Sequence, residues 1–127
     1  MVKRLKHYFD DFKKNPNIKT ATELRDAALL REKIIRDVYN RLIAMDKIEL
    51  GSEIVDELIN KVSAIAGLMK RVVAGKTDIK KEIPLIEKLV NEYMENKKHI
   101  HKELKEDAKD ICQKEFYNLL ILEEKAA

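Results

Sequence analysis

The chain has 127 residues, 45% of them hydrophobic, which is enough for one domain with its own core but too few for two. Charged residues make up 39% of the sequence, yet the net charge is only +3, so no strong global field attracts nucleic acid or an anionic membrane. No uncharged stretch approaches the roughly 20 residues of a membrane span. We therefore expect a single helical domain, residues 1–127, that does not associate with a membrane.

Two further features of the composition bear on where the protein works. Cys112 is the only cysteine, which excludes an intramolecular disulfide and fits a reducing compartment, so we expect a cytoplasmic protein. The enrichment in lysine and glutamate is typical of hyperthermophile proteins, although an AT-rich genome also enriches lysine and isoleucine. The sequence leaves these two origins open.

Helix-breaking residues are rare, and apolar residues recur with the spacing of α-helices along most of the chain. The first predicted helix, residues 2–14, is short and amphipathic and ends before Pro16. Thr20 followed by Glu23 is the pattern of a capping box and predicts the start of a long second helix. The sequence therefore predicts an all-α fold, a four- to five-helix bundle that is mainly antiparallel.

One charged residue interrupts the apolar stripe of the second helix. Arg31 occupies a core-side position between Ala28 and Ile35. Because a long arginine side chain can extend to the edge of a core, we expect the guanidinium to reach solvent or to meet an acid from a neighbouring helix. A buried, functional arginine is the alternative.

The third predicted helix, residues 53–74, is the most apolar, and we expect it at the centre of the bundle, with its end at Gly75. Gly67 in its middle costs about 1 kcal/mol relative to alanine. The small neighbours Ser63, Ala64 and Ala66 predict the close approach of another helix, whose packing would offset that cost. A cofactor slot against the bare backbone is the alternative.

Nothing breaks helical propensity from residue 83 to about residue 124, which predicts a long C-terminal helix. Pro84 lies either in the first turn of this helix or at a kink within a helix that begins at Asp78. Residues 95–98 contain no apolar side chain. We therefore expect a break or bend near Asn96.

The apolar seam of this long helix is narrow and flanked by charge, as in a coiled coil. Residues 116–122 then form an apolar cluster interrupted only by Asn118, and a segment this apolar must be buried. We predict a non-enzymatic protein–protein interaction module, either a homodimer or a small subunit of a larger assembly. The predicted partner interface consists of Tyr93, Ile100, Leu104, Ala108, Ile111, Phe116, Leu119, Leu120 and Leu122.

The sequence contains no motif for catalysis or nucleotide binding that rises above chance. Glu95, His99 and Glu103 share one helical face, which is a weak pattern for metal ligands, but the Glu-x-x-His pairs of di-iron bundles are missing. We therefore expect no enzymatic activity, no cofactor and no metal site.

Two basic clusters support the alternative function, a nucleic-acid-binding accessory protein. The first cluster consists of Lys70, Arg71, Lys76, Lys80 and Lys81. The second spans residues 3–14 and includes Lys3 and Lys14. Should the folded chain bring the clusters together, they would contact phosphates without reading bases. Because acidic residues are interspersed along every helix, we expect weak, salt-sensitive binding at most.

Overall fold

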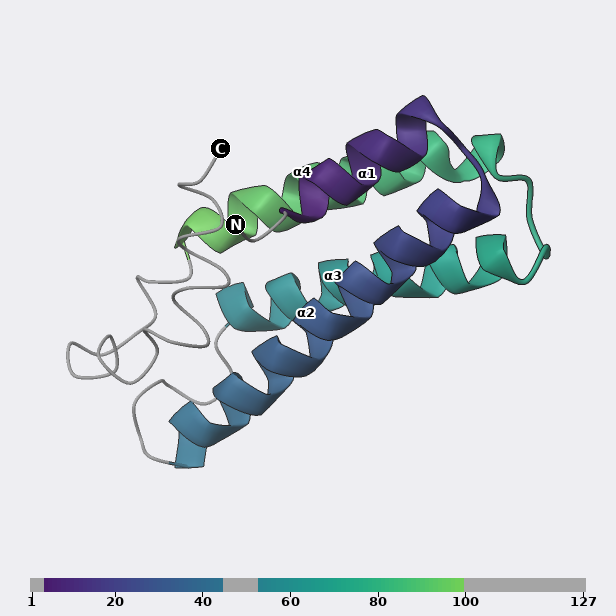
Figure 1. Ribbon diagram of the computed structural model, residues 1–127. Coiled ribbons are helices and arrows are strands. Elements are labelled where there is room, and N and C mark those ends of the chain that lie inside the picture. Colours follow the sequence, from purple (N-terminus) through teal and green to yellow (C-terminus); the bar gives the residue numbers. More distant parts are fainter. Residues whose placement is uncertain (1–3, 45–52, 100–127) are drawn as a thin grey trace.

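The computed structural model describes residues 4–44 and 53–99, and these ranges contain helices and no strand (Figure 1). The elements are α1 (Leu5–Lys14), α2 (Ile18–Ala44), α3 (Glu53–Val73), the 3-10 turn η1 (Lys80–Glu82) and α4 (Ile83–His99). The prediction of an all-α bundle is confirmed. A fifth helix of the predicted bundle would lie outside the described residues.

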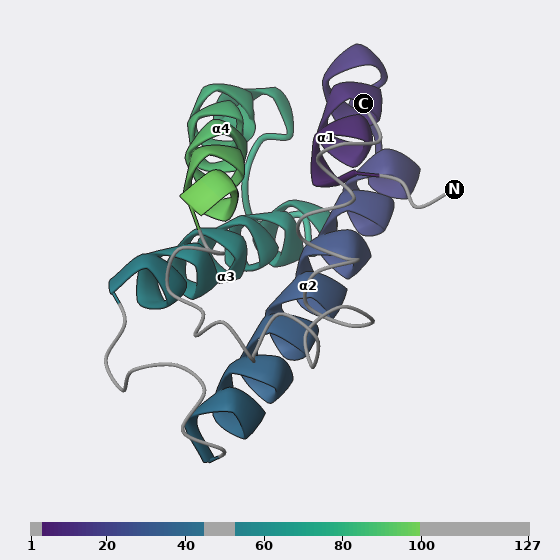
Figure 2. The same cartoon turned by 90° about the vertical axis from the view of Figure 1, so that its left-hand side faces the viewer.

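The four helices alternate in direction and close into a ring, in which each helix packs on the next and α1 also packs on α4. The two most extensive interfaces, α2–α3 and α3–α4, both involve α3, the most apolar helix. Figure 2 shows that α2 is steeply inclined and diverges from α3 toward the C-terminal end of α2. The shared core consists of Leu5, Phe9, Phe12, Ala21, Leu24, Ala27, Ala28, Ile35, Tyr39, Leu58, Ile59, Val62, Ile65, Ala66, Met69, Val72, Ile86, Val90 and Tyr93.

The helix α2 begins earlier than the sequence pattern predicts. Asn17 precedes the first helical residue, and its Oδ1 accepts a hydrogen bond from the backbone N–H of Thr20 at 2.9 Å. In return, the backbone N–H of Asn17 donates to Thr20 Oγ1 at 3.3 Å. This reciprocal pair is a capping box with asparagine as the N-cap. The predicted box of Thr20 with Glu23 is wrong, because Thr20 already lies in the first turn.

The helix α3 ends as predicted at Gly75, whose φ of 72° is a left-handed conformation that glycine adopts without strain. The N–H of Gly75 donates to the carbonyl of Val72 at 3.1 Å, and the N–H of Lys76 donates to that of Arg71 at 3.0 Å. Both bonds together form a Schellman motif, which satisfies carbonyls at the helix end. Pro84 lies in the first turn of α4, where its missing N–H costs no helical hydrogen bond.

Gly67 lies on an exposed part of α3, and a Cβ built on it would meet no atom within 4 Å. Among the described residues, therefore, no helix closely approaches Gly67 itself, whereas Ala66 of the same small-residue patch is buried in the core. The packing of residues 4–44 and 53–99 gives no compensation for the low helix propensity of this glycine.

Arg31 is buried, with 3% of its surface exposed. Its Nη1 donates to the carbonyl of Ala27 one turn earlier, at 3.1 Å, and its guanidinium carbon lies 6.0 Å from the ring centre of Tyr8 on α1. The carbonyl and the negative face of the ring replace water around the charge. The predicted extension of Arg31 to solvent is wrong, because the side chain is buried beside Tyr8 of α1. The other predicted arrangement, an acid from a neighbouring helix beside Arg31, stays a prediction.

The helix α4 carries a second buried cation over a tyrosine ring. Lys97 is 1% exposed, and its Nζ lies 5.7 Å from the ring centre of Tyr93, which is itself fully buried. Lys97 extends the buried stripe of α4 one turn beyond Tyr93. The helix passes through Asn96 without interruption, so no break occurs there. The predicted continuation from residue 100 onward lies outside the described residues.

Candidate nucleic-acid interface

Alternating helix directions place four helix ends together at one end of the bundle: the end of α1, the start of α2, the end of α3 and the start of α4 (Figure 1). An ion pair joins α1 to α4 here, with Lys13 Nζ 2.6 Å from Glu87 Oε2. We call this region the basic end. It is defined by six exposed cations: Lys14, Lys19, Arg71, Lys76, Lys80 and Lys81. Lys70, also exposed, lines a surface hollow with Glu32 and Asp37 in the middle of α2 and is not counted here.

None of the six cations of the basic end forms an ion pair with a described residue. Other cations of the structure do form such pairs. Lys61 on α3 lies 2.6 Å from Glu92 on α4, and this hydrogen bond raises the pKa of Lys61 and lowers that of Glu92. At the basic end no such partner competes with an external anion, so the charges there are available for phosphate contacts.

Two carboxylates of the basic end make short local hydrogen bonds to neutral groups. Asp78 Oδ1 accepts the backbone N–H of Lys80 at 3.0 Å, which is the hydrogen bond of an Asx turn. Glu82 Oε1 accepts the hydroxyl of Thr77 at 2.9 Å. Neither carboxylate forms an ion pair with a cation of the basic end, although Asp78 lies between those cations in the sequence and Glu82 directly follows Lys81.

The structure divides the second predicted cluster. Lys13 and Lys14 lie at the basic end, whereas Arg4 and Lys6 lie at the other end of α1. At about 1.5 Å per residue, the length of α1 separates the two groups by roughly 15 Å. Lys3 falls outside the described residues. Only the C-terminal part of this cluster therefore joins the first one.

Sequence analysis missed Lys19, an exposed residue in the first turn of α2. The turn after α1 separates it from the second cluster along the chain. Because α2 runs antiparallel to α1, the start of α2 nevertheless lies beside the end of α1. The predicted antiparallel topology was therefore sufficient to place Lys19 near the C-terminal part of the second cluster.

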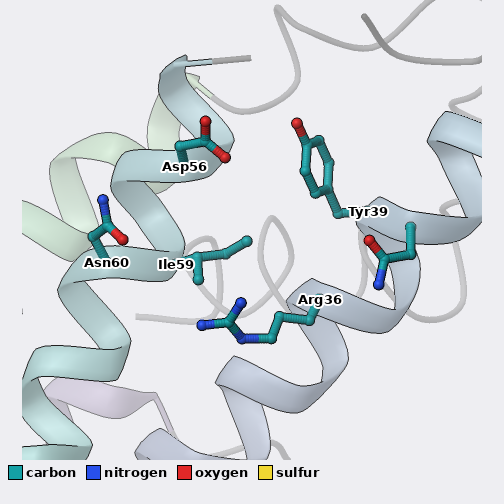
Figure 3. A pocket seen from close by; sticks show the side chains of 6 residues that line it. Arg36, Tyr39, Asp56, Ile59 and Asn60 are labelled. Atoms are coloured by element: carbon teal, nitrogen blue, oxygen red, sulfur yellow. The ribbon is translucent and has the colours of Figure 1, made fainter. Parts of the chain in front are cut away.

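A separate feature is a cleft of about 440 Å³ where α2 diverges from α3 (Figure 3). Its lining consists of Arg36, Tyr39, Asn40, Asp56, Ile59 and Asn60. Arg36 is paired with Glu32 on its own helix at 3.3 Å. The cleft can donate and accept hydrogen bonds, but its lining includes no thiol or imidazole and none of the cations of the basic end.

The predicted partner interface is represented in the described residues by Tyr93 alone. Tyr93 is fully buried in the core of its own chain, as are Ile86 and Val90 earlier in the same stripe. The described part of the seam is therefore used for packing within the chain. The other eight interface residues, from Ile100 to Leu122, lie outside the described residues.

The predicted face with metal-ligand spacing is also only partly described. Glu95 is exposed on α4, while Glu103 and the side chain of His99 fall outside what the structure describes. Within the described ranges, no three His, Cys, Asp or Glu residues come together in a group suited to a metal ion. No helix in these ranges combines the length and the apolar character needed to cross a membrane.

Comparison of the chain with protein-family models, with curated proteins and with solved structures finds no match. The class of protein is thus set by the fold, a small all-α bundle. The candidate interface is set by the exposed cations at one end of it.

Proposed function

We propose that this protein is a non-enzymatic nucleic-acid-binding protein that contacts phosphates through the basic end. The observation that supports the proposal most directly is the position of six exposed cations, none of them paired with a described residue, at four neighbouring helix ends. The net charge of +3 describes the whole chain, whereas phosphates at one surface experience mainly the charges within about 10 Å, the Debye length at moderate salt. A local concentration of cations is therefore sufficient for binding.

Binding through phosphates releases counterions, so the affinity should fall steeply with salt. We expect measurable binding of mixed-sequence nucleic acid at about 50 mM salt and strong weakening by about 200 mM. Fluorescence anisotropy with labelled oligonucleotides of unrelated sequences measures the affinity at each salt concentration. Similar affinities for all sequences are expected, because contacts to the backbone carry no sequence information.

The test variant replaces Lys76, Lys80 and Lys81 together by glutamine. Each lost phosphate contact should reduce the slope of log K against log salt by about 0.9, so the slope should fall by about 3. The matched control is Lys88→Gln, which removes an exposed cation that lies near Glu92 on α4 (4.0 Å). Undetectable binding by the unmodified protein at about 50 mM salt would refute the proposal.

Self-association is a second candidate function, supported by the apolar cluster in residues 116–122. Such a cluster favours burial against another surface, and a second copy of the chain supplies one. Measuring the mass in solution with and without nucleic acid separates the two candidates. A dimer unaffected by nucleic acid supports self-association alone, and a mass increase that requires nucleic acid supports the basic end.

A further inference from the structure

The cations of the basic end are spread over neighbouring helices. Arg71 belongs to the last turn of α3, Lys80 and Lys81 precede α4, and Lys14 ends α1. Axes of packed helices lie about 8–10 Å apart. At this spacing, cations on two adjacent helices are separated by a distance comparable to the width of the major groove of a double helix, roughly 12 Å. A surface of this width can contact phosphates of two strands across a groove, whereas a single strand offers only one line of phosphates.

The aromatic side chains of the described residues are not available for stacking on bases. Phe9, Phe12, Tyr39 and Tyr93 are buried, and the ring of Tyr8 is half-buried and lies against the guanidinium of Arg31. Proteins that bind single strands without sequence preference rely on exposed aromatic rings, each worth about 1–3 kcal/mol per stacked base. Within residues 4–44 and 53–99, the basic end therefore offers charge without a stacking platform.

From these two observations we infer that the basic end binds double-stranded nucleic acid in preference to single strands, by spanning phosphates of both strands. This inference rests on the proposed function and specifies its ligand. The higher charge density of a duplex also favours duplex binding over single-strand binding, because each neutralised phosphate releases more counterion from B-DNA than from a single strand.

The experiment compares a labelled DNA duplex of about 20 base pairs with each of its two separate strands, in anisotropy titrations of the full chain at about 50 mM salt. We expect the duplex to bind about tenfold more tightly than either strand, since only the duplex presents two rows of phosphates. The variant with Lys76, Lys80 and Lys81 replaced by glutamine should lose most of the duplex affinity. Lys88→Gln should retain it, and circular dichroism should show unchanged helix content in both variants.

The possible results distinguish a failure of the duplex preference from a failure of nucleic-acid binding as such. Equal or tighter binding of a single strand overturns the duplex preference and leaves nucleic-acid binding intact. Loss of duplex affinity in Lys88→Gln equal to that in the triple variant places binding outside the basic end and overturns the inference. Absence of binding to all three oligonucleotides overturns both the proposed function and the duplex preference.

Discussion

Replacing Gly67 by alanine should stabilise the protein. Gly67 lies within α3, and a Cβ at this position meets open space among the described residues. Alanine has the higher helix propensity by about 0.8–1.0 kcal/mol, because glycine loses more backbone freedom on folding. We therefore expect the free energy of unfolding to rise by about 1 kcal/mol. For a domain of this size the melting temperature should rise by about 3–5 °C, followed by circular dichroism during thermal and urea unfolding.

The matched control is Gly75→Ala, the same substitution two turns along the chain. Gly75 has a φ of 72°, so a Cβ there is strained although it too meets open space. This variant should lose about 1–2 kcal/mol. A destabilised Gly67→Ala would refute the reasoning, since it would mean that a surface not among the described residues, or a second copy of the chain, packs against this glycine. A concentration-dependent loss of stability would identify the second copy.

Further predictions concern the buried arginine, an ion pair, the C-terminal segment and metal binding. A double-mutant cycle with Arg31→Met and Tyr8→Leu should give a coupling energy of about 0.5–2 kcal/mol, and additive effects would argue against a cation–π contact. The hydrogen bond from Lys61 and the nearby lysine charges lower the pKa of Glu92 in the folded state. The ionised Glu92 side chain therefore contributes to stability above the ordinary carboxyl pKa of 4.5, and this contribution is lost as the pH falls through the lowered pKa. Lys61→Gln should thus reduce the loss of stability between about pH 5 and pH 2 in urea titrations, and an unchanged pH profile would contradict this linkage. Removing residues 115–127 should convert a dimer to a monomer or unfold the chain, whereas a monomeric full-length protein at high concentration in light scattering would exclude the homodimer. Treatment with a chelator should leave the melting temperature unchanged, and a drop restored by one specific metal would require a metal site.

Sequence periodicity was sufficient to predict the helices and several of their ends. Gly75 ends α3 because only glycine adopts the required φ without strain, and Pro84 lies in a first turn because no hydrogen bond is lost there. These are local effects within a few residues, so the sequence alone determines them. The start of α2 was missed, because Asn17 and Thr20 form a capping box with different residue types from the usual pattern.

The basic end was only partly predictable. Its cations could be read from the sequence, and an antiparallel topology already places the ends of α1 and α3 beside the starts of α2 and α4. The pairing of charges could not be predicted, since it depends on which side chains face each other across helices. Only the folded chain sets Glu92 next to Lys61 and Glu87 next to Lys13.

The sequence by itself determined that this protein is an all-α bundle, because apolar residues at helical spacing must bury one face of each helix. The tertiary structure alone decided the environment of each charge. Arg31 is buried because α1 supplies the ring of Tyr8 beside it, while the cations of the basic end are exposed and form no ion pair with a described carboxylate. Burial and pairing depend on contacts between residues far apart in the chain, and no local pattern encodes them.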